Sequence, residues 1–451
     1  MVYDLDGWIF RKRLMTRKMW CHVIIGILVA CGLTNCQKSK QASTIVTFKP
    51  GADIQMEVQE EFILAEPETV IQFEAGIFEF TSGLSLDVDR VTLRGRGMDE
   101  TILSFKHQEA GAEGLYITSD NVLVEDLAIE DTKGNGLKSY AANNIIIRRV
   151  RAEWTGGPKK TNGAYGIYPV SSKNVLVEGC IAIGGSDSGI YVGQSQNIII
   201  RNCRAEYNVA GIEIENCYGA DAFGNIARHN TGGILVFDLP DIPQQRGHDI
   251  RLFGNQVYDN NTLNFAPEGN MVANVPTGTG IMVMANANVE IFDNEIREHG
   301  TVNLLVTSYF SSGIAIKDPN YYPFPEAIHI HHNTFGSGGY DPLGDGGELM
   351  DLVLGRPIPD IVWDGVVDPQ KLVDGDIPAE FRIYIHSNTV LPAKEGRDGE
   401  PISRGRTSIS FANMGGLATL TDLTKAQVKR DLAYYSGTLP PVEPVAIAGI
   451  E

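Results

Sequence analysis

The sequence predicts an all-β solenoid, a parallel β-helix with about 23 residues in each coil. Two series of segments repeat along its 451 residues at nearly constant spacing. In one, an asparagine precedes three aliphatic residues, at Asn121, Asn144, Asn174 and Asn197. In the other, glycine precedes isoleucine, at Gly166, Gly189, Gly211 and Gly233, with steps of 23, 22 and 22 residues. A fixed period of this length indicates one supersecondary unit stacked on copies of itself.

The local pattern inside each copy is that of a short β-strand. Apolar and polar residues alternate, and glycine, asparagine and aspartate separate one apolar stretch from the next. The repeat contains no stretch of helical periodicity long enough for a helical repeat. Because similar strands stack in register, we expect parallel sheets with successive coils about 4.8 Å apart.

Residues 1–30 are predicted to be a bacterial lipoprotein signal peptide. Basic residues gather between positions 11 and 18, and the apolar run from Val23 to Ala30 is too short to span a bilayer. The run ends in Leu28-Val-Ala-Cys31, which resembles the lipobox of bacterial lipoproteins. This resemblance implies lipidation of Cys31, and a lipid anchor that places the protein in the cell envelope, at the outer membrane or the periplasmic face. Residues 31–52 would then form a polar tether.

The β-helix itself is predicted to span residues 53–412 and to begin with a capping helix. Ile54, Val58 and Phe62 follow helical spacing, and a helix here would cover the core and strand edges of the first coil. The segments that follow, such as Val91-Thr-Leu-Arg-Gly, resemble the start of right-handed β-helix proteins of the pectate-lyase-like superfamily. That resemblance implies a right-handed winding.

A narrower resemblance concerns three glycine-rich segments. Residues 185–193, 232–240 and 280–284 look like segments of a bacterial family of parallel β-helix repeat-containing proteins. The resemblance implies the fold and assigns no chemistry.

Insertions lengthen the later coils. They comprise Leu239–Gly247, Leu263–Thr279 and Tyr309–Glu326, followed by a longer excursion at 336–380. Each enters beside a glycine–isoleucine strand, so we expect them to wall one side of the stack, where solenoid proteins often bind ligands. Thr407–Phe411 is predicted as a last strand, Leu423–Leu432 as a helix, and residues 413–451 as a cap with a loose tail.

One position of the asparagine strand predicts a ladder of side chains inside a corner of the coils. It is occupied by Cys180, Cys203, Asn225, Asn255, Asn294, Asn333 and Asn388. Stacked amides of this kind bond to the backbone of the next coil. Parallel stacking suits a disulfide poorly, so we expect Cys180, Cys203 and Cys217 to be free, buried thiols.

Alternate residues of the glycine–isoleucine strands are predicted to face outward in two rows. The first row is Tyr116, Lys138, Tyr168, Tyr191, Glu213, Leu235 and Met282, and the second is Thr118, Tyr140, Val170, Gly193, Glu215, Phe237 and Met284. Aromatic rings stack on sugars, whereas carboxylates and lysine bind hydroxyl groups or transfer protons. We therefore predict substrate binding by Tyr116, Tyr140, Tyr168, Tyr191 and Phe237, and catalysis by Glu213, Glu215, Asp238 and Lys138.

Other interpretations of these rows stay open. Outward tyrosines also stabilise sheets by stacking, and the apolar end of the rows could lie beneath the insertions. The sequence has no cofactor motif, but Glu213 and Glu215 with Asp238 could instead hold Ca²⁺.

Three histidines form a second, weaker candidate site. His329 and His331 face outward on one strand, and His386 takes the position of His331 in a later strand. Such a set could bind Zn²⁺ or Cu²⁺ if the intervening excursion leaves the strands together.

The formal net charge of −19 argues against binding to nucleic acid. A polysaccharide is the expected partner, and the enzyme class would be a hydrolase, lyase or epimerase. Two alternatives are a non-catalytic envelope interaction module and a periplasmic metal-handling accessory protein that uses the histidine strand.

Overall fold

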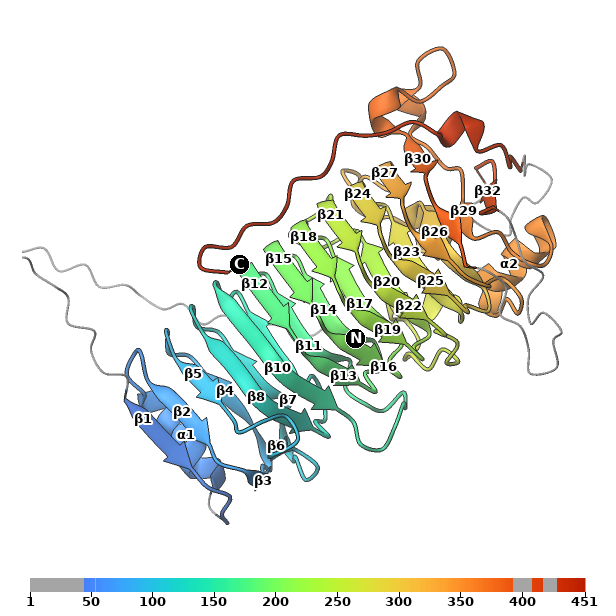
Figure 1. The fold of residues 1–451 in the computed structure, drawn as a ribbon. Helices are drawn as coiled ribbons and strands as arrows, with labels where there is room; N and C mark the ends of the chain where they lie inside the picture. The colour runs from blue at the N-terminus through green and yellow to red at the C-terminus, as the bar shows by residue number, and fades with distance from the viewer. Residues whose placement is uncertain (1–43, 53, 392–407, 417–427, 451) are drawn as a thin grey trace, which may run out of the picture. The chain divides into compact units, whose positions relative to one another are not determined.

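The computed structural model describes residues 44–52, 54–391, 408–416 and 428–450. In this part of the chain, short strands follow one another around each coil and pair in parallel with the equivalent strands of the neighbouring coils (Figure 1). Three ladders of strands result, which form a 21-stranded sheet and an 11-stranded sheet. The predicted parallel β-helix is confirmed.

The first ladder contains the asparagine strands. It consists of β1 (Ile45–Phe48), β2 (Val70–Phe73), β5 (Thr92–Arg94), β8 (Leu123–Glu130), β10 (Ile145–Glu153), β12 (Lys173–Glu178), β15 (Gln196–Arg201), β18 (Tyr218–Phe223), β21 (His248–Phe253), β24 (Ala287–Phe292), β27 (Glu326–His331) and β30 (Ile383–His386).

The second ladder follows the first around the coil, and the long strands β8 and β10 belong to both. Its other strands are β3 (Gly76–Glu79), β6 (Thr101–Ser104), β13 (Ile181–Ile183), β16 (Arg204–Glu206), β19 (Ile226–Arg228), β22 (Gln256–Tyr258), β25 (Glu295–Arg297), β28 (Thr334–Phe335) and β31 (Thr389–Val390).

The third ladder, the 11-stranded sheet, contains the glycine–isoleucine strands. It consists of β4 (Ser82–Leu86), β7 (Ala110–Ile117), β9 (Leu137–Tyr140), β11 (Tyr165–Val170), β14 (Ser188–Gly193), β17 (Ala210–Glu215), β20 (Gly232–Phe237), β23 (Thr279–Met284), β26 (Val302–Thr307), β29 (Ile361–Trp363) and β32 (Phe411–Asn413).

A left-handed corner at the start of the first-ladder strands explains the repeated asparagines. Asn121, Asn144, Asn174 and Asn197 have φ between 55° and 60°, a left-handed conformation that asparagine tolerates better than most residues. Their side chains also connect the coils, because Asn144 Nδ2 donates to Asn121 Oδ1 at 2.9 Å and Asn174 Nδ2 donates to Asn144 Oδ1 at 2.7 Å.

The predicted ladder of buried amides is also present. Asn225 Nδ2 donates to Asn255 Oδ1 at 3.0 Å, and Asn255 Nδ2 donates to Asn294 Oδ1 at 2.9 Å. Cys180, Cys203 and Cys217 are free and buried, as expected. A second ladder, which the sequence analysis missed, is formed by Asn208, Asn230, Asn260 and His299.

The capping helix is α1 (Ile54–Leu64), which buries Ile54, Val58 and Phe62 against the first coil. The stack starts earlier than predicted, because Ile45–Phe48 forms β1 and pairs with β2 instead of belonging to a tether. The long excursion at 336–380 likewise does not lie wholly outside the stack. It contains helix α2 (Gly344–Leu354), but it also supplies β29 to the third ladder.

The insertions cover the outward face of the third ladder from β20 to β26. The outward side chains of Leu235, Met282 and Leu305 are buried in a second apolar cluster, separate from the main core. The insertions supply other members of this cluster, including Val272, Val275, Tyr309, Tyr321, Leu349 and Met350. Among the described residues of this face, the outward side chains that keep contact with solvent therefore lie on the earlier coils, up to β17.

The C-terminal predictions need correction. The last strand is Phe411–Asn413, and Val428–Leu432 is not helical, whereas the remainder of the predicted helix lies outside the described residues. The tail is not loose. Val442 and Ile447 are buried, and residues 440–450 run back along the first ladder (Figure 1).

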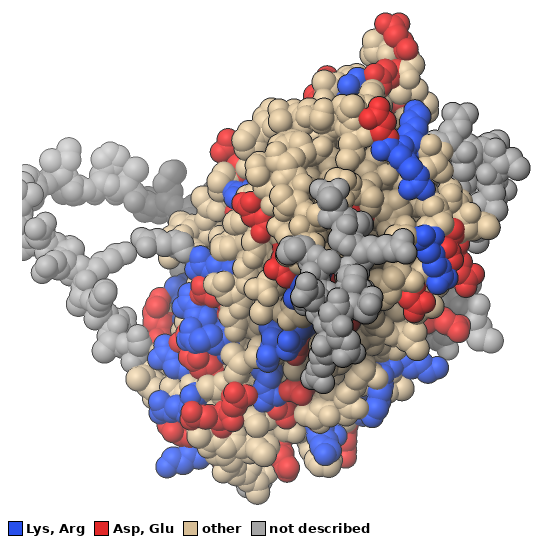
Figure 2. Space-filling view, turned by 45° about the vertical axis from the view of Figure 1, so that its right-hand side comes forward, with Lys and Arg blue, Asp and Glu red and all other residues tan. Residues whose placement is uncertain are grey.

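The predicted signal peptide and Cys31 lie outside the described residues. Within the described ranges, no helix has the length and apolar character needed to cross a bilayer. On the face shown in Figure 2, basic and acidic side chains are interspersed. Ion pairs also connect neighbouring coils, such as those of Arg149 with Asp126 and of Arg96 with Glu74.

Candidate functional site

The uncovered part of the third ladder presents a strip of aromatic and basic side chains. Tyr116, Lys138 and Tyr168 occupy equivalent positions on successive strands, as the register of β7, β9 and β11 requires. The Lys138 Nζ atom lies 5.7 Å from the ring centroid of Tyr116 and 5.2 Å from that of Tyr168. It also lies 3.5 Å from Glu113 Oε1. All four side chains are half-buried, so each presents one side to solvent.

Three tyrosines meet at the next coil. The ring of Tyr165 lies 4.4 Å from that of Tyr168 and 4.6 Å from that of Tyr191, centroid to centroid. Tyr168 and Tyr191 contact each other edge to face at 5.0 Å. Tyr191 is only 3% exposed, whereas Tyr165 and Tyr168 remain half-buried. Tyr165 and Tyr168 therefore keep part of their side chains accessible, and both pack on the buried ring of Tyr191.

Three carboxyl groups lie beneath and beside these rings. The Ser188 hydroxyl group contacts both Glu213 Oε2 and Asp187 Oδ1. Asn270, from the 263–279 insertion, donates from Nδ2 to Asp187 Oδ2 at 2.9 Å. Glu215 accepts a hydrogen bond of 2.7 Å from the Tyr191 hydroxyl group. Glu213 is 1% exposed and Asp187 6%, whereas Glu215 is partly exposed.

The environment of these carboxyl groups favours their neutral forms. Burial raises the pKa of Glu215 to about 7, against the lowering effect of the Tyr191 hydrogen bond. Burial also raises the pKa of Asp187 to about 6. The pKa of Glu213 is held well above its ordinary range by burial, with the charges of Asp187 and Glu215 adding to the effect. Burial raises the pKa of Tyr168 to about 12, so its phenol is protonated at neutral pH.

Glycine at position 193 makes the Tyr191–Glu215 contact possible. A Cβ atom placed on Gly193 would lie 2.2 Å from the Tyr191 hydroxyl oxygen and 2.4 Å from a ring carbon. A methyl group cannot fit there. Because Gly193 has no side chain, the Tyr191 ring can lie over it and reach Glu215 on the next coil.

The structure brings together most of the predicted site residues, with four corrections. Tyr191 is 3% exposed and Glu213 1%, so the predictions that Tyr191 contacts a substrate and that Glu213 is a catalytic group are wrong. Phe237 is 1% exposed and packs in the second apolar cluster, so the prediction that it contacts a substrate is wrong. Asp238 is fully buried, and its Oδ1 accepts hydrogen bonds from Asn216 Nδ2 at 2.9 Å and from the backbone N of Gly247 at 2.7 Å. It holds the 239–247 insertion and is unavailable for catalysis on a surface ligand. Tyr140 is 48% exposed at the edge of the strip.

Sequence reasoning missed Tyr165, Asp187, Ser188 and Asn270. Asp187 and Ser188 stand in a Gly-Ser-Asp-Ser-Gly corner, where small polar residues suggest a turn more than a site. Asn270 is 83 residues from Asp187, and only the folded insertion places it there. The use of Glu213 and Glu215 to hold Ca²⁺ stays a prediction.

The histidines lie on the first ladder, away from this strip. His331 is opposite His386 in the register of β27 and β30, so the excursion does not separate them. The pKa of His329 is lowered to about 4 by burial and by the neighbouring histidines, and burial also lowers the pKa of His386. Both effects favour the neutral imidazoles of His329 and His386 at pH 7.

The model of a family described as "Right handed beta helix region" matches residues 94–242. This chain winds as a right-handed parallel β-helix. Two similar solved structures are the A-modules of the mannuronan C-5 epimerases AlgE4 and AlgE6 of Azotobacter vinelandii. For AlgE4 the identity is 17%, the TM-score 0.49, and the match covers 76% of this chain and 97% of the other. For AlgE6 the identity is 14% and the TM-score 0.46, and the match covers 75% of this chain and 88% of the other. No curated protein matches the chain.

Proposed function

We propose that this protein binds a polysaccharide along the uncovered strip of the third ladder, and that Glu215 acts there as a general acid–base residue. The observation that carries the proposal is the packing of the half-buried rings of Tyr165 and Tyr168 on the buried ring of Tyr191, whose hydroxyl group bonds to Glu215, a carboxyl group of raised pKa. In the described part of the chain, the strip combines aromatic rings, hydroxyl donors and a group that can transfer a proton.

The strip has the side chains that sugar recognition requires. The faces of Tyr116 and Tyr168 can stack on the C–H faces of sugar rings. Lys138, held between these two rings, can donate hydrogen bonds to hydroxyl or carboxylate groups. Because coils repeat along the ladder, these residues form a row, which suits an extended chain of sugars better than a single sugar.

The protonation of Glu215 suits acid–base chemistry. A group whose pKa is close to the ambient pH is populated in both forms, so it can give and take a proton at useful rates. With a pKa of about 7, Glu215 meets this condition. Burial holds the pKa of Glu213 well above its ordinary range, which favours the neutral form of this carboxyl group beside Glu215. Hydrolysis, elimination and epimerisation all need such a group.

The proposal includes the location of the protein. The lipobox-like Leu28–Cys31 segment supports lipidation of Cys31 and an envelope lipoprotein, whose stack would meet envelope or environmental glycans. Labelling with a radioactive or clickable fatty acid in a bacterial host tests this. Label in the wild type that is lost in Cys31→Ala supports the anchor, and equal labelling of both contradicts it.

Binding and turnover are tested separately. The affinity for each glycan of a panel is measured for the wild type, Tyr168→Ala and Lys138→Ala. Tyr207→Ala is the matched control. Tyr207 is an exposed tyrosine outside the strip, stacked on His229. We expect one glycan to bind, with affinity reduced about tenfold or more in the two strip variants and unchanged in the control. Equal affinity of all variants would reject the strip as the binding surface.

Turnover of that glycan is then measured in three assays. New reducing ends report chain cleavage, absorbance of unsaturated products reports elimination, and NMR of the sugar configuration reports epimerisation. Glu215→Gln should lower the rate by a factor of about 100 or more and leave binding in place. Activity that survives this substitution would reject Glu215. Binding without turnover by the wild type would favour the non-catalytic module.

A further inference from the structure

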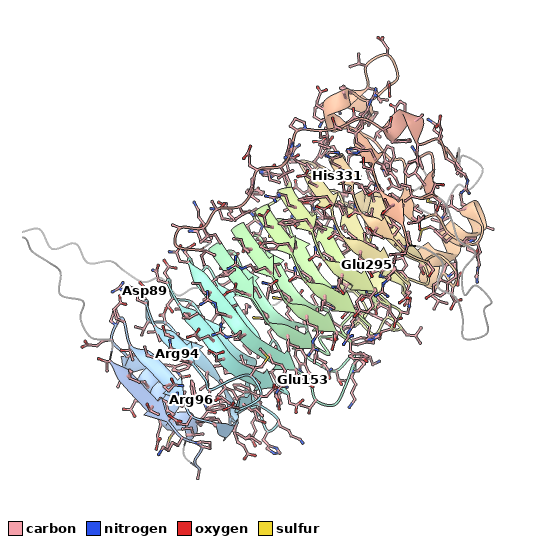
Figure 3. All side chains as sticks on the ribbon, in the orientation of Figure 1. Asp89, Arg94, Arg96, Glu153, Glu295 and His331 are labelled. Carbon is pink, nitrogen blue, oxygen red and sulfur yellow. The ribbon has the colours of Figure 1, made fainter. Side chains whose placement is uncertain are left out.

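A cluster of imidazole and carboxylate groups lies on the outward face of the first ladder, near its C-terminal end. Glu290 on β24 is opposite His329 on β27, and His331 on β27 is opposite His386 on β30. Residues 41 and 57 positions apart thus come into contact because three successive coils stack in register. Figure 3 labels His331 at this end of the first ladder, well separated from Glu295 on β25.

The donor atoms of three of these residues converge. His331 Nε2 lies 3.0 Å from Glu290 Oε1, and His329 Nδ1 lies 4.0 Å from the same oxygen. Together the ligand atoms of Glu290, His329 and His331 lie within 4.8 Å of one another. Ligands bound at about 2.0–2.1 Å in a tetrahedral arrangement lie roughly 3.4 Å apart, so small side-chain movements would fit these atoms around one ion.

His329 has a buried nitrogen atom that lacks a partner. The residue is 6% exposed, and its Nδ1 makes no hydrogen bond with any described residue. Its other nitrogen, Nε2, lies 2.8 Å from His386 Nε2. If Nε2 donates to His386, the lone pair of Nδ1 points toward the Glu290 carboxylate. Two electron-rich groups would then face each other in a poorly solvated site, an arrangement that a cation between them would relieve.

The C-terminal segment fixes the carboxylate from the other side. The backbone N of Val442 donates to Glu290 Oε2 at 3.2 Å, which leaves Oε1 directed toward the histidines. Contacts of this kind orient metal ligands in proteins. The ring of His331 is also held, stacked on Phe292 at 5.3 Å and on His386 at 5.3 Å. Since His331 and His386 are only partly buried, an ion could enter from solvent beside them.

The basic residue opposite Glu290 on the preceding coil is already paired. Arg251 on β21 is opposite Glu290, but its Nη1 lies 3.4 Å from Asp221 Oδ2. Its positive charge is therefore matched by the Asp221 carboxylate, and Glu290 makes its polar contacts with the histidines and with Val442.

We propose that Glu290, His329 and His331 bind a divalent transition metal ion of the Zn²⁺ class, with His386 orienting His329. Imidazole ligands favour zinc, copper and nickel over calcium and magnesium, which prefer oxygen ligands. Three protein ligands leave a fourth position for water or another ligand. The site is distinct from the tyrosine strip, because it lies on another ladder and uses none of its residues.

Equilibrium dialysis of the chelator-treated, intact chain against Zn²⁺, followed by elemental analysis, tests the proposal. We expect about one zinc ion per chain, and an affinity for Ca²⁺ lower by a factor of 100 or more. His329→Ala, His331→Ala and Glu290→Gln should each weaken zinc binding at least tenfold. His248→Ala and Glu295→Gln are matched controls, since both residues are on outward faces elsewhere, and they should bind as the wild type does.

A spectroscopic measurement covers the case in which a variant folds poorly. Co²⁺ added to the wild-type protein should give visible absorption typical of nitrogen and oxygen ligands in a four-coordinate site, and Zn²⁺ should abolish it. His331→Gln, which changes a partly exposed residue, should lose the band while its circular dichroism is unchanged. Absence of zinc retention by the wild type, or retention that the ligand variants share with the controls, would overturn the proposal.

Discussion

The hydroxyl group of Tyr191 bonds to Glu215 across two rows of the third ladder. Tyr191 is opposite Glu213 in the register, and Gly193 is opposite Glu215, so the 2.7 Å hydrogen bond runs diagonally between neighbouring coils. This geometry ties the most buried tyrosine of the strip to its partly exposed carboxyl group. The protonation of Glu215 consequently depends on the position of one aromatic ring.

Replacing Tyr191 by phenylalanine should raise the pKa of Glu215 above 7. The hydrogen bond from Tyr191 lowers that pKa, and burial, the larger effect, would then act without it. Carboxyl ¹³C chemical shifts titrated by NMR, assigned by comparison with Glu215→Gln, measure the change. Tyr168→Phe keeps the hydrogen bond and serves as the control. An unchanged or lowered pKa in Tyr191→Phe would contradict this account.

Gly193→Ala should displace the Tyr191 ring, since the new methyl group would lie 2.2 Å from the hydroxyl oxygen. We expect the titration of Glu215 to shift in the same direction as in Tyr191→Phe, and the free energy of unfolding to fall by about 1–3 kcal/mol through overpacking. Urea unfolding and the NMR titration measure these effects. Gly51→Ala is the control, because its nearest atom would lie at an ordinary contact distance of 3.9 Å. Equal stability of the two variants would show that the ring adapts without cost.

Glu215 should make the protein less stable as the pH rises. Its folded pKa of about 7 lies above the ordinary value of 4.5, so the folded state binds more protons than the unfolded state between these values. The contribution of Glu215 to the free energy of unfolding is fully present below about pH 4.5 and is lost as the pH rises through 7. Relative to Glu215→Gln, the wild type should lose on the order of 2 kcal/mol of unfolding free energy between pH 5 and pH 8.

Glu178 supplies a contrast of opposite sign. Burial raises its pKa, but hydrogen bonds from Arg148 and Arg201 outweigh burial, and the pKa is lowered overall. Relative to Glu178→Gln, the wild type should therefore have the extra unfolding free energy from ionised Glu178 at neutral pH. It should lose this contribution as the pH falls below 4.5. Urea unfolding of the wild type, Glu215→Gln and Glu178→Gln between pH 4 and pH 8 measures both pH dependences. A Glu215 difference independent of pH would show that this carboxyl group titrates normally.

Asn255→Ala should be among the costlier substitutions in the amide ladder. Asn255 Oδ1 accepts from the backbone N of Asn225, and its Nδ2 donates to the backbone oxygen of Ala222, so truncation leaves buried backbone groups unpaired. We expect a loss of about 2–4 kcal/mol. Asn388→Ala, at the half-buried end of the same ladder, should cost less, because water can reach the groups it leaves. Thermal unfolding compares the two, and equal losses would contradict the role of burial.

The sequence determines the register of this fold because the repeat is local. The period of the asparagine and glycine–isoleucine strands fixed which side chains share a row, and the structure confirms that Tyr168, Tyr191 and Glu213 lie on one face. The alternation did not show which rows are covered. Phe237 follows the same pattern as Glu215, and it is buried only because remote insertions fold over it.

Contacts made by irregular segments could not be predicted. Asn270 reaches Asp187 from an insertion, and Val442 reaches Glu290 across 152 positions, and neither contact has a periodic signal. The histidines were visible as a pattern, but the carboxylate that completes the cluster was not. Their relation depends on the return of the chain to the first ladder after a long excursion.

The last prediction concerns the C-terminal segment, which lies along the first ladder. Ile447 packs with Leu176 and Ile199, and the backbone N of Val445 donates to Asp221 Oδ2 at 3.2 Å. Ile447→Asp would place a charge in this apolar contact, so the segment should detach while the coils stay folded. Hydrogen exchange should then lose protection at the amides of Val442 and Val445, by a factor of about 10 or more.

Glu443→Ala is the matched control for this experiment, since Glu443 is an exposed residue of the same segment. Its amide protection should equal that of the wild type. Because Val442 also holds Glu290, Ile447→Asp should in addition weaken zinc binding, although residue 447 is not a ligand. Unchanged protection in Ile447→Asp would mean that the hydrogen bonds to Glu290 and Asp221, rather than the apolar contact, keep the segment on the ladder.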